Sequence, residues 1–302
     1  DALARAYVAT EKPAYARRVA VILDLFAQRY PHYPVMQNLP RRVAFREQKA
    51  PWPWDSGRWN FFHNNIPIEL LPAYDMVYLS SEFDRLSAER GYDVRERLEQ
   101  DFLKPSCEEI MLRTDHVNNC VGYDVRSAAI LGRIINEPRY VHWAYHWMQR
   151  NLTAGFMRDG FWMEGTPSYH AMTVGGLQYA FAAVKGYSDP PGYKDPVTGT
   201  RLDNLDPDRD FPLWAQCQTA PHVLAAPNGY TPTMHDAWPY ERRAQPRSET
   251  VSQIMPAVGH AALGRGYGPD QMQAHLHFSG GYGHQHHDNL NLTLWAKGKE
   301  ML

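Results

Sequence analysis

Apolar residues recur at helical spacing along most of the first 225 residues. Residues 2–29 carry them at positions such as Val19, Leu23 and Phe26, with charged residues between, and Pro13 divides this stretch into two predicted helices. Residues 31–57, rich in proline and tryptophan, and residues 187–211, rich in proline, aspartate and glycine, predict loops. Further helical patterns cover residues 68–86, 94–112 (interrupted by Pro105), 121–135, 140–152, 170–184 and 212–224.

The pattern changes after Pro256. Residues 274–278 and 290–295 alternate between apolar and polar positions, as half-buried strands do. Lys297-Gly298-Lys299 predicts a hairpin turn, with residues 300–302 starting a return strand. Successive helical hairpins with short connectors favour an α/α toroid, also called a helical barrel. The sequence therefore predicts a mainly α protein, with a helical domain over residues 1–250 and the first strands of a β domain over residues 251–302.

Composition excludes several classes of protein. The 302 residues hold 31 Lys and Arg against 33 Asp and Glu, whereas a general nucleic-acid binder would carry a basic excess. We find no apolar run long enough to span a bilayer. The three cysteines are too few and too widely spaced for a disulfide framework or a CxxC metal site. Because the sequence opens on Asp1 and ends in a strand-like run, we expect a fragment of a longer protein.

Aromatic residues make up 13% of the chain, and one group of them is interleaved with a cation and amides. That mixture suits an acidic sugar, because aromatic rings stack on sugar rings; a packing cluster at the start of a helix is an equally good interpretation. The candidate substrate-binding residues of this group are Arg58, Trp59, His63 and Asn64.

The segment 283–290, Gly-His-Gln-His-His-Asp-Asn-Leu, is the sharpest chemical feature of the sequence. If its side chains alternate, His284, His286 and Asp288 share one face and His287 points the other way. One face could then supply both a proton-transferring imidazole and a metal ligand. A solvated His-rich loop is the alternative.

Two other segments carry candidate chemistry. Residues 159–170 predict a tight turn followed by a helix that begins near Tyr169, and the positive end of that helix could favour the phenolate form. A tyrosine that only packs the turn is the competing interpretation. Residues 114–119 include His116, Asn118 and Asn119, whose side chains could bind a carboxylate, although asparagine pairs usually form turns and caps.

The order of these segments resembles the heparinase II/III-like polysaccharide lyases. The resemblance rests on Asp159-Gly160, Glu164, Pro167 and Tyr169-His170 in the helical part, and on the His-rich segment among Gly-rich strands. It implies an incomplete α/α toroid followed by the first strands of an antiparallel β-sandwich. It also implies β-elimination on an anionic polysaccharide that contains uronic acid, of the alginate or glycosaminoglycan type.

The resemblance further implies roles for single residues. Tyr169 matches the catalytic tyrosine, as base, acid or both, and His284 matches the catalytic histidine. His116 and Asn119, expected to share a helix face, are favoured for neutralising the substrate carboxylate, with Asn118 as the alternative. Glu164 is expected to contact substrate. His286 matches a histidine that binds structural zinc in several members, whose other ligands would follow Leu302; no organic cofactor is implied, and Asp288 is expected to orient an imidazole or close the turn.

Two other functions compete with this one. The spacing of His284, His286 and Asp288 partly resembles the ligand run of metallo-β-lactamases, so a zinc-dependent hydrolase is one alternative. A non-catalytic glycan-binding protein is the other. The size of a polysaccharide substrate suggests a secreted or periplasmic protein. The sequence does not indicate which uronic polysaccharide is used or the oligomeric state.

Overall fold

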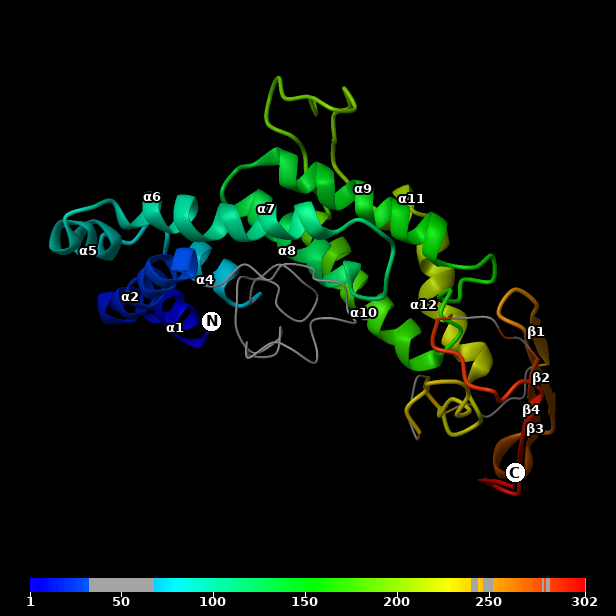
Figure 1. Ribbon diagram of the computed structural model, residues 1–302. Coiled ribbons are helices and arrows are strands. Elements are labelled where there is room, and N and C mark those ends of the chain that lie inside the picture. The colour runs from blue at the N-terminus through cyan, green and yellow to red at the C-terminus, as the bar shows by residue number, and fades with distance from the viewer. Residues whose placement is uncertain (33–67, 240–243, 247–251, 279, 281–282, 302) are drawn as a thin grey trace, which may run out of the picture. The chain divides into compact units, whose positions relative to one another are not determined.

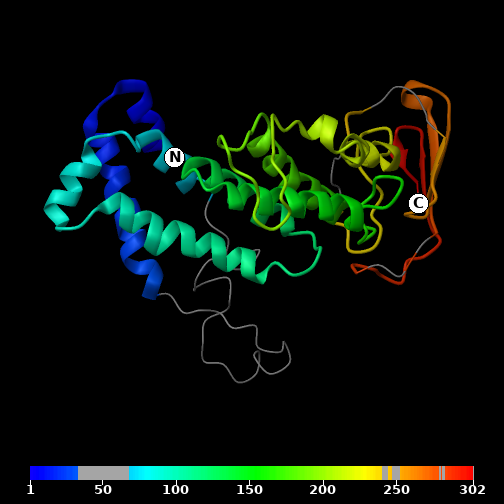
Figure 2. The same cartoon turned by 90° about the horizontal axis from the view of Figure 1, so that it is seen from above.

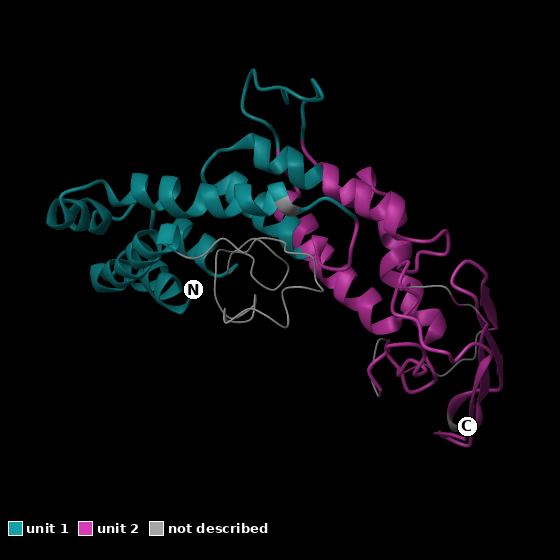
Figure 3. Cartoon of the chain, viewed as in Figure 1, with its two compact units in different colours: residues 1–116, 123–145, 188–203 teal, residues 117–122, 146–187, 204–302 magenta. Residues whose placement is uncertain are grey.

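The computed structural model describes residues 1–32, 68–239, 244–246, 252–278, 280 and 283–301 (Figures 1 and 2). Two compact units divide the chain (Figure 3). Unit 1 comprises residues 1–116, 123–145 and 188–203, and unit 2 comprises residues 117–122, 146–187 and 204–302. The division falls within helices α8 (Val121–Ile134) and α9 (Pro138–Gly155). The strands thus belong to the same unit as the helices directly before them, and a domain boundary at residue 250 stays a prediction.

Unit 1 is helical, and the helix α2 (Pro13–Arg29) packs against most of its neighbours. Its apolar stripe, which includes Val19 and Leu23, is buried, and Pro13 opens it as predicted. The helices that pack against α2 are α1 (Ala2–Thr10), α4 (Leu70–Val77), α5 (Glu82–Arg90) and α6 (Val94–Leu98).

Two helical predictions for unit 1 differ from the structure in detail. The pattern over residues 68–86 forms α4 and α5 rather than one helix; between them the Ser80 hydroxyl accepts a hydrogen bond from the Glu82 backbone N–H at 3.3 Å. Pro105 does not interrupt a helix, because it lies in the first turn of α7 (Lys104–Arg113), where its missing N–H is not needed. The π-helical turn η2 (Glu99–Leu103) joins α6 to α7.

Unit 2 contains the helices nearest in sequence to the strands. These are the end of α9, α10 (Pro167–Val184), α11 (Pro207–Asp210) and α12 (Leu213–Leu224); α11 falls in a stretch predicted to be loop. Helix α12 packs against α10 and against the strand β2. An apolar cluster joins α12 to the strand region and is made of Phe161, Ala220, Leu224, Met234, Met255 and Val258.

Five antiparallel strands of unit 2 form a sheet in sequential order. They are β1 (Gln253–Met255), β2 (His260–Arg265), β3 (Met272–His277), β4 (Asn291–Ala296) and β5 (Lys299–Glu300). The predicted hairpin between β4 and β5 is confirmed, although Lys299, expected in the turn, begins β5. The two turn residues, Lys297 and Gly298, have φ values of 52° and 75°, the left-handed conformation that two-residue hairpin turns need. Strands β1 and β2 were not predicted.

The two faces of this sheet have an unusual distribution of residues. The register places His260 opposite His277, and His275 lies on the same face; all three are buried. The other face carries Ile254 and Leu263, which are 64% and 66% exposed. The polar face is therefore the buried one, and its imidazoles are held by hydrogen bonds such as that from His260 Nε2 to His275 Nδ1 at 3.1 Å.

None of the helices that the structure describes combines the length and the apolar character needed to cross a bilayer.

Candidate functional site

A double turn leads from α9 into α10 and positions the tyrosine of the site. Phe156 pairs with Trp162, the Met157 N–H donates to the Phe161 carbonyl at 2.8 Å, and Gly160 closes the turn with φ of 78°. Helix α10 then begins at Pro167, which places Tyr169 in its first turn. These backbone contacts confirm the predicted tight turn. Glycine suits position 160 because it adopts a positive φ without strain.

The Tyr169 and His284 rings lie face to face. Their centroids are 3.6 Å apart and their planes differ by 18°. Tyr169 comes from the first turn of α10, and His284 from the loop that precedes β4. The resemblance implied that both residues are catalytic, and the structure brings their rings together within unit 2. Their catalytic roles stay predictions.

One carboxylate, Asp236, joins the two rings. Its Oδ2 accepts a hydrogen bond from the Tyr169 hydroxyl at 3.2 Å and another from His284 Nδ1 at 3.0 Å. The Asp236 backbone N–H also donates to the His284 carbonyl at 3.1 Å. Sequence reasoning missed Asp236, because its segment contains no recognisable pattern and lies far from both partners in the chain.

The pKa of Tyr169 is raised from its usual value of 10, first by burial and then by the negative charge and hydrogen bond of Asp236. The sequence analysis expected the helix N-terminus to favour the phenolate. That expectation is wrong for this structure, because removal from water and a neighbouring carboxylate both favour the protonated phenol. The protonated phenol is therefore the favoured form of Tyr169.

Glu164 lies on the other side of His284. Its Oε2 accepts hydrogen bonds from Asn119 Nδ2 at 2.8 Å and from Trp162 Nε1 at 2.7 Å, and its Oε1 is 3.7 Å from His284 Nε2. The carboxylate thus fixes the orientation of the Asn119 amide. The second Nδ2 hydrogen of Asn119 is the group that could contact a substrate carboxylate.

Two other residues, His116 and Asn118, were considered for carboxylate binding, and their roles stay predictions. Residues 114–120 are not helical, so the expectation that His116 and Asn119 share a helix face is wrong. The Asn118 side chain instead accepts the Cys120 N–H at 2.9 Å, a local turn that precedes α8. His116 is exposed, contacts Asp115, and belongs to unit 1, whereas Tyr169, His284 and Asn119 belong to unit 2.

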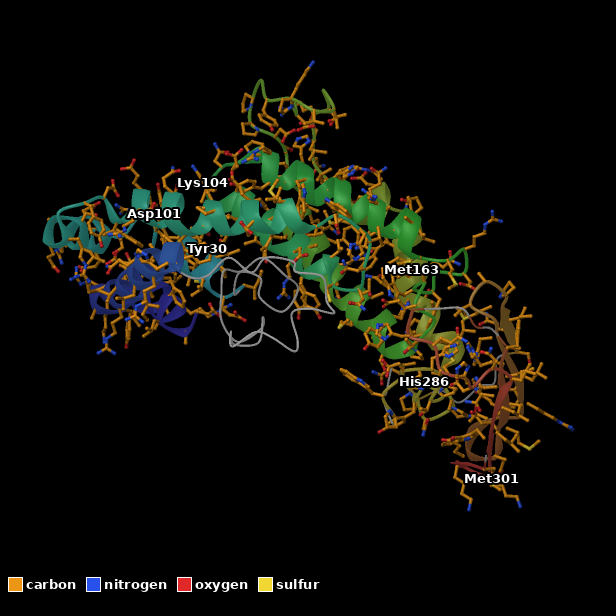
Figure 4. All side chains as sticks on the ribbon, viewed as in Figure 1. Tyr30, Asp101, Lys104, Met163, His286 and Met301 are labelled. Carbon is orange, nitrogen blue, oxygen red and sulfur yellow. The ribbon has the colours of Figure 1, made fainter. Side chains whose placement is uncertain are left out.

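The His-rich segment is a loop and not a strand, and two of its side chains have different partners: His286 approaches Asp236, and Asp288 contacts His235. His286, labelled in Figure 4, is 58% exposed, and its Nε2 is 3.9 Å from Asp236 Oδ1. Asp288 Oδ1 is 2.8 Å from His235 Nδ1, and its Oδ2 accepts the His235 N–H at 2.6 Å. Although burial opposes it, these contacts with His235 lower the pKa of Asp288. Asp288 therefore contacts the His235 residue, and its expected role in orienting an imidazole stays a prediction; His287 is exposed.

His284, His286 and Asp288 do not converge on one point, as the ligands of a single metal ion would. Within the described part of the chain, no group of three or more His, Cys, Asp or Glu side chains is arranged to hold a metal ion. The residues present therefore do not by themselves form a zinc site, and zinc binding by His286 stays a prediction.

The four aromatic-cluster residues predicted to bind substrate, Arg58, Trp59, His63 and Asn64, lie in residues 33–67, outside the described part of the chain.

Comparisons with known proteins give structural matches only. No family model and no curated protein matches the sequence. Among solved structures, a mutant of heparan sulfate lyase HepC from Pedobacter heparinus is similar over 99% of this chain and 46% of its own, with a TM-score of 0.64 and 15% identity. A structure of heparinase III is similar over 99% of this chain and 48% of its own, with a TM-score of 0.59 and 14% identity.

These similarities show the fold. The protein has an incomplete α/α toroid followed by strands of an antiparallel β-sandwich, as the sequence analysis expected. The chain spans about half the length of the lyases that it resembles. At such low identity the likeness carries no statement about activity.

Proposed function

We propose that this protein is a polysaccharide lyase that cleaves an anionic polysaccharide containing uronic acid, of the alginate or glycosaminoglycan type, by β-elimination. The observation that carries the proposal is the stacked pair of Tyr169 and His284, joined by Asp236. A phenol and an imidazole held this close can act on the same sugar ring as proton donor and proton acceptor. The lyase fold of the structural neighbours supports the same conclusion.

The chemistry requires three groups. The proton at C5 of a uronate is weakly acidic, so the adjacent carboxylate must be neutralised while charge develops on it. Asn119, whose amide is hydrogen-bonded to Glu164, is the donor that we propose for this purpose. A base then takes the C5 proton, a double bond forms between C4 and C5, the C4–O bond breaks, and an acid protonates the departing oxygen. The base and the acid are the two residues of the stacked pair, Tyr169 and His284.

The arrangement favours this reaction over metal-dependent hydrolysis. A zinc hydrolase would need His284, His286 and Asp288 to converge on one ion, whereas two of these side chains approach Asp236 and the third contacts His235. No step of the proposed reaction involves a metal.

Zinc at His286 is a separate proposal, checked by elemental analysis of the purified protein with His286→Ala as the comparison. A polymeric substrate also leads us to propose a secreted or periplasmic location.

The test is a panel of uronic polysaccharides assayed for the ultraviolet absorbance of newly formed unsaturated uronate. Wild-type protein is expected to generate this signal with at least one polymer, and Tyr169→Phe to abolish it while binding is retained. Tyr179→Phe is the matched control, because Tyr179 lies on the same helix and is 62% exposed. Binding without product by the wild type across the panel would instead support a non-catalytic glycan-binding protein.

A further inference from the structure

We propose that Asp236 is a positioning residue that assigns the two proton-transfer roles, with Tyr169 as the acid and His284 Nε2 as the base. This inference rests on the proposed lyase function and deepens it. Asp236 is not expected to contact the reacting atoms; it acts through the two rings that do.

The first argument is the number of protons at the shared oxygen. A carboxylate oxygen only accepts hydrogen bonds, so both partners of Asp236 Oδ2 must donate. The Tyr169 hydroxyl therefore keeps its proton, and the neutral His284 ring carries its proton on Nδ1. The lone pair of His284 is then on Nε2, on the side of the ring away from Asp236. Glu164 Oε1 lies 3.7 Å from this nitrogen, beyond hydrogen-bond distance, so the lone pair stays available to take a proton.

The second argument is how firmly Asp236 is held. The preceding residue, His235, has φ of 53°, an unusual conformation for a side chain of this size, and is buried. Its backbone N–H and its Nδ1 both contact Asp288, and its Nε2 is 2.6 Å from His277 Nε2. A strained residue persists only where its surroundings fix it, and such residues gather at functional sites.

The contacts of His235 also fix the position of the next residue, Asp236. Asp288 and His277 lock His235, and the N–H of Asp236 is bound to the His284 carbonyl. The carboxylate of Asp236 is thereby placed against both rings, although its side chain is 43% exposed. Asp236 thus has the two properties that a positioning residue needs: a rigid backbone and a carboxylate that reaches both rings.

In the reaction, His284 Nε2 takes the proton from C5, the C5–H electron pair forms the C4=C5 double bond, and the C4–O electron pair leaves with the oxygen. The phenol of Tyr169 gives its proton to that oxygen. The resulting imidazolium and phenolate return to their starting forms by proton exchange with solvent. Asp236 stabilises the imidazolium through Nδ1 without receiving the proton.

The test compares Asp236→Asn with Asp270→Asn, an exposed aspartate of the same unit. Two readouts do not depend on turnover. The ultraviolet titration of tyrosine, taken as the difference between each protein and its Tyr169→Phe counterpart, isolates Tyr169. Nitrogen NMR of the histidine rings, assigned with His284→Gln, reports which nitrogen of His284 carries the proton. Asp288→Asn is a second variant, which leaves Asp236 itself intact.

With Asp236→Asn we expect the Tyr169 titration to move to lower pH, the His284 ring to lose its preference for Nδ1–H, and kcat to fall by about 100-fold with little change in KM. Asp288→Asn should move the same signals in the same direction by a smaller amount, and Asp270→Asn should move none.

Unchanged Tyr169 titration and His284 tautomer in both Asp236→Asn and Asp288→Asn would overturn the inference. So would an active wild type whose kcat is not lowered by Asp236→Asn; the lyase function would then stand without this role for Asp236. A wild type that forms no unsaturated product would refute the lyase function instead, while the titration and NMR readouts would still decide whether Asp236 positions the two rings.

Discussion

His170, the residue after the candidate acid, is predicted to be structural. It is fully buried, its Nδ1 accepts the Trp162 backbone N–H at 3.1 Å, and its Nε2–H donates to the Cys217 carbonyl at 2.9 Å. The ring also stacks on Phe161 with centroids 4.6 Å apart. His170 therefore ties the turn before α10 to α12.

The variant His170→Phe keeps an aromatic ring for stacking but removes both hydrogen-bonding nitrogens. A buried donor and a buried acceptor are then left unsatisfied, and each costs about 1–3 kcal/mol. The free energy of unfolding should fall by about 2–6 kcal/mol, a large share of the roughly 5–15 kcal/mol that holds a typical domain together.

The assay is urea denaturation followed by circular dichroism. Tyr179→Phe, an exposed change on the same helix, is the control and should shift the free energy of unfolding by less than about 0.5 kcal/mol. If His170→Phe unfolded at the same urea concentration as the wild type, the two hydrogen bonds would not be holding the turn, and the reasoning would be refuted.

Three further results are expected. Asn119→Ala should lower kcat/KM by about 100-fold, as loss of one donor to a developing charge does, whereas Asn118→Ala should change stability by about 1 kcal/mol and kcat/KM little; equal kinetic losses would contradict this assignment. Burial, and then the neighbouring His235, lower the pKa of His277 from 6.5 to about 4, so stability should be full above pH 6.5 and fall as the pH drops through 4. His277→Gln should weaken this dependence in pH-dependent urea titrations, with the remainder due to buried His260, and an unchanged dependence would contradict this. Tyr169 has a raised pKa, so its contribution to stability should be complete below pH 10 and lost as the pH rises above it; identical alkaline unfolding of wild type and Tyr169→Phe would contradict this.

The sequence predicted those elements whose local pattern is sufficient. Helices α2, α9 and α10 have long apolar stripes, and the β4–β5 hairpin has its own turn residues. Strand β1 has only three residues, and β2 reads His-Ala-Ala-Leu-Gly-Arg, so neither carries a clear alternation. Their strand conformation depends on pairing, of β1 with β2 and of β2 with β3, which no local pattern contains.

The residues of the candidate site were likewise predicted only where the local sequence is distinctive. Tyr169 and His284 were found because each lies in a distinctive segment. Asp236 was missed because it is 67 residues from Tyr169 and 48 from His284, and only the fold brings the three together. The expectation that His116 and Asn119 share a helix face failed for a local reason, since residues 114–120 form the turn before α8, in which the Asn118 side chain accepts the Cys120 N–H.

The central claim is tested most directly by digesting a susceptible uronic polysaccharide in water enriched in heavy oxygen and examining the new chain ends by mass spectrometry. Elimination breaks the C4–O bond without adding water, so the account predicts unsaturated ends that carry no heavy oxygen, and none at all from Tyr169→Phe. New non-reducing ends that are saturated would show hydrolysis and would contradict the account.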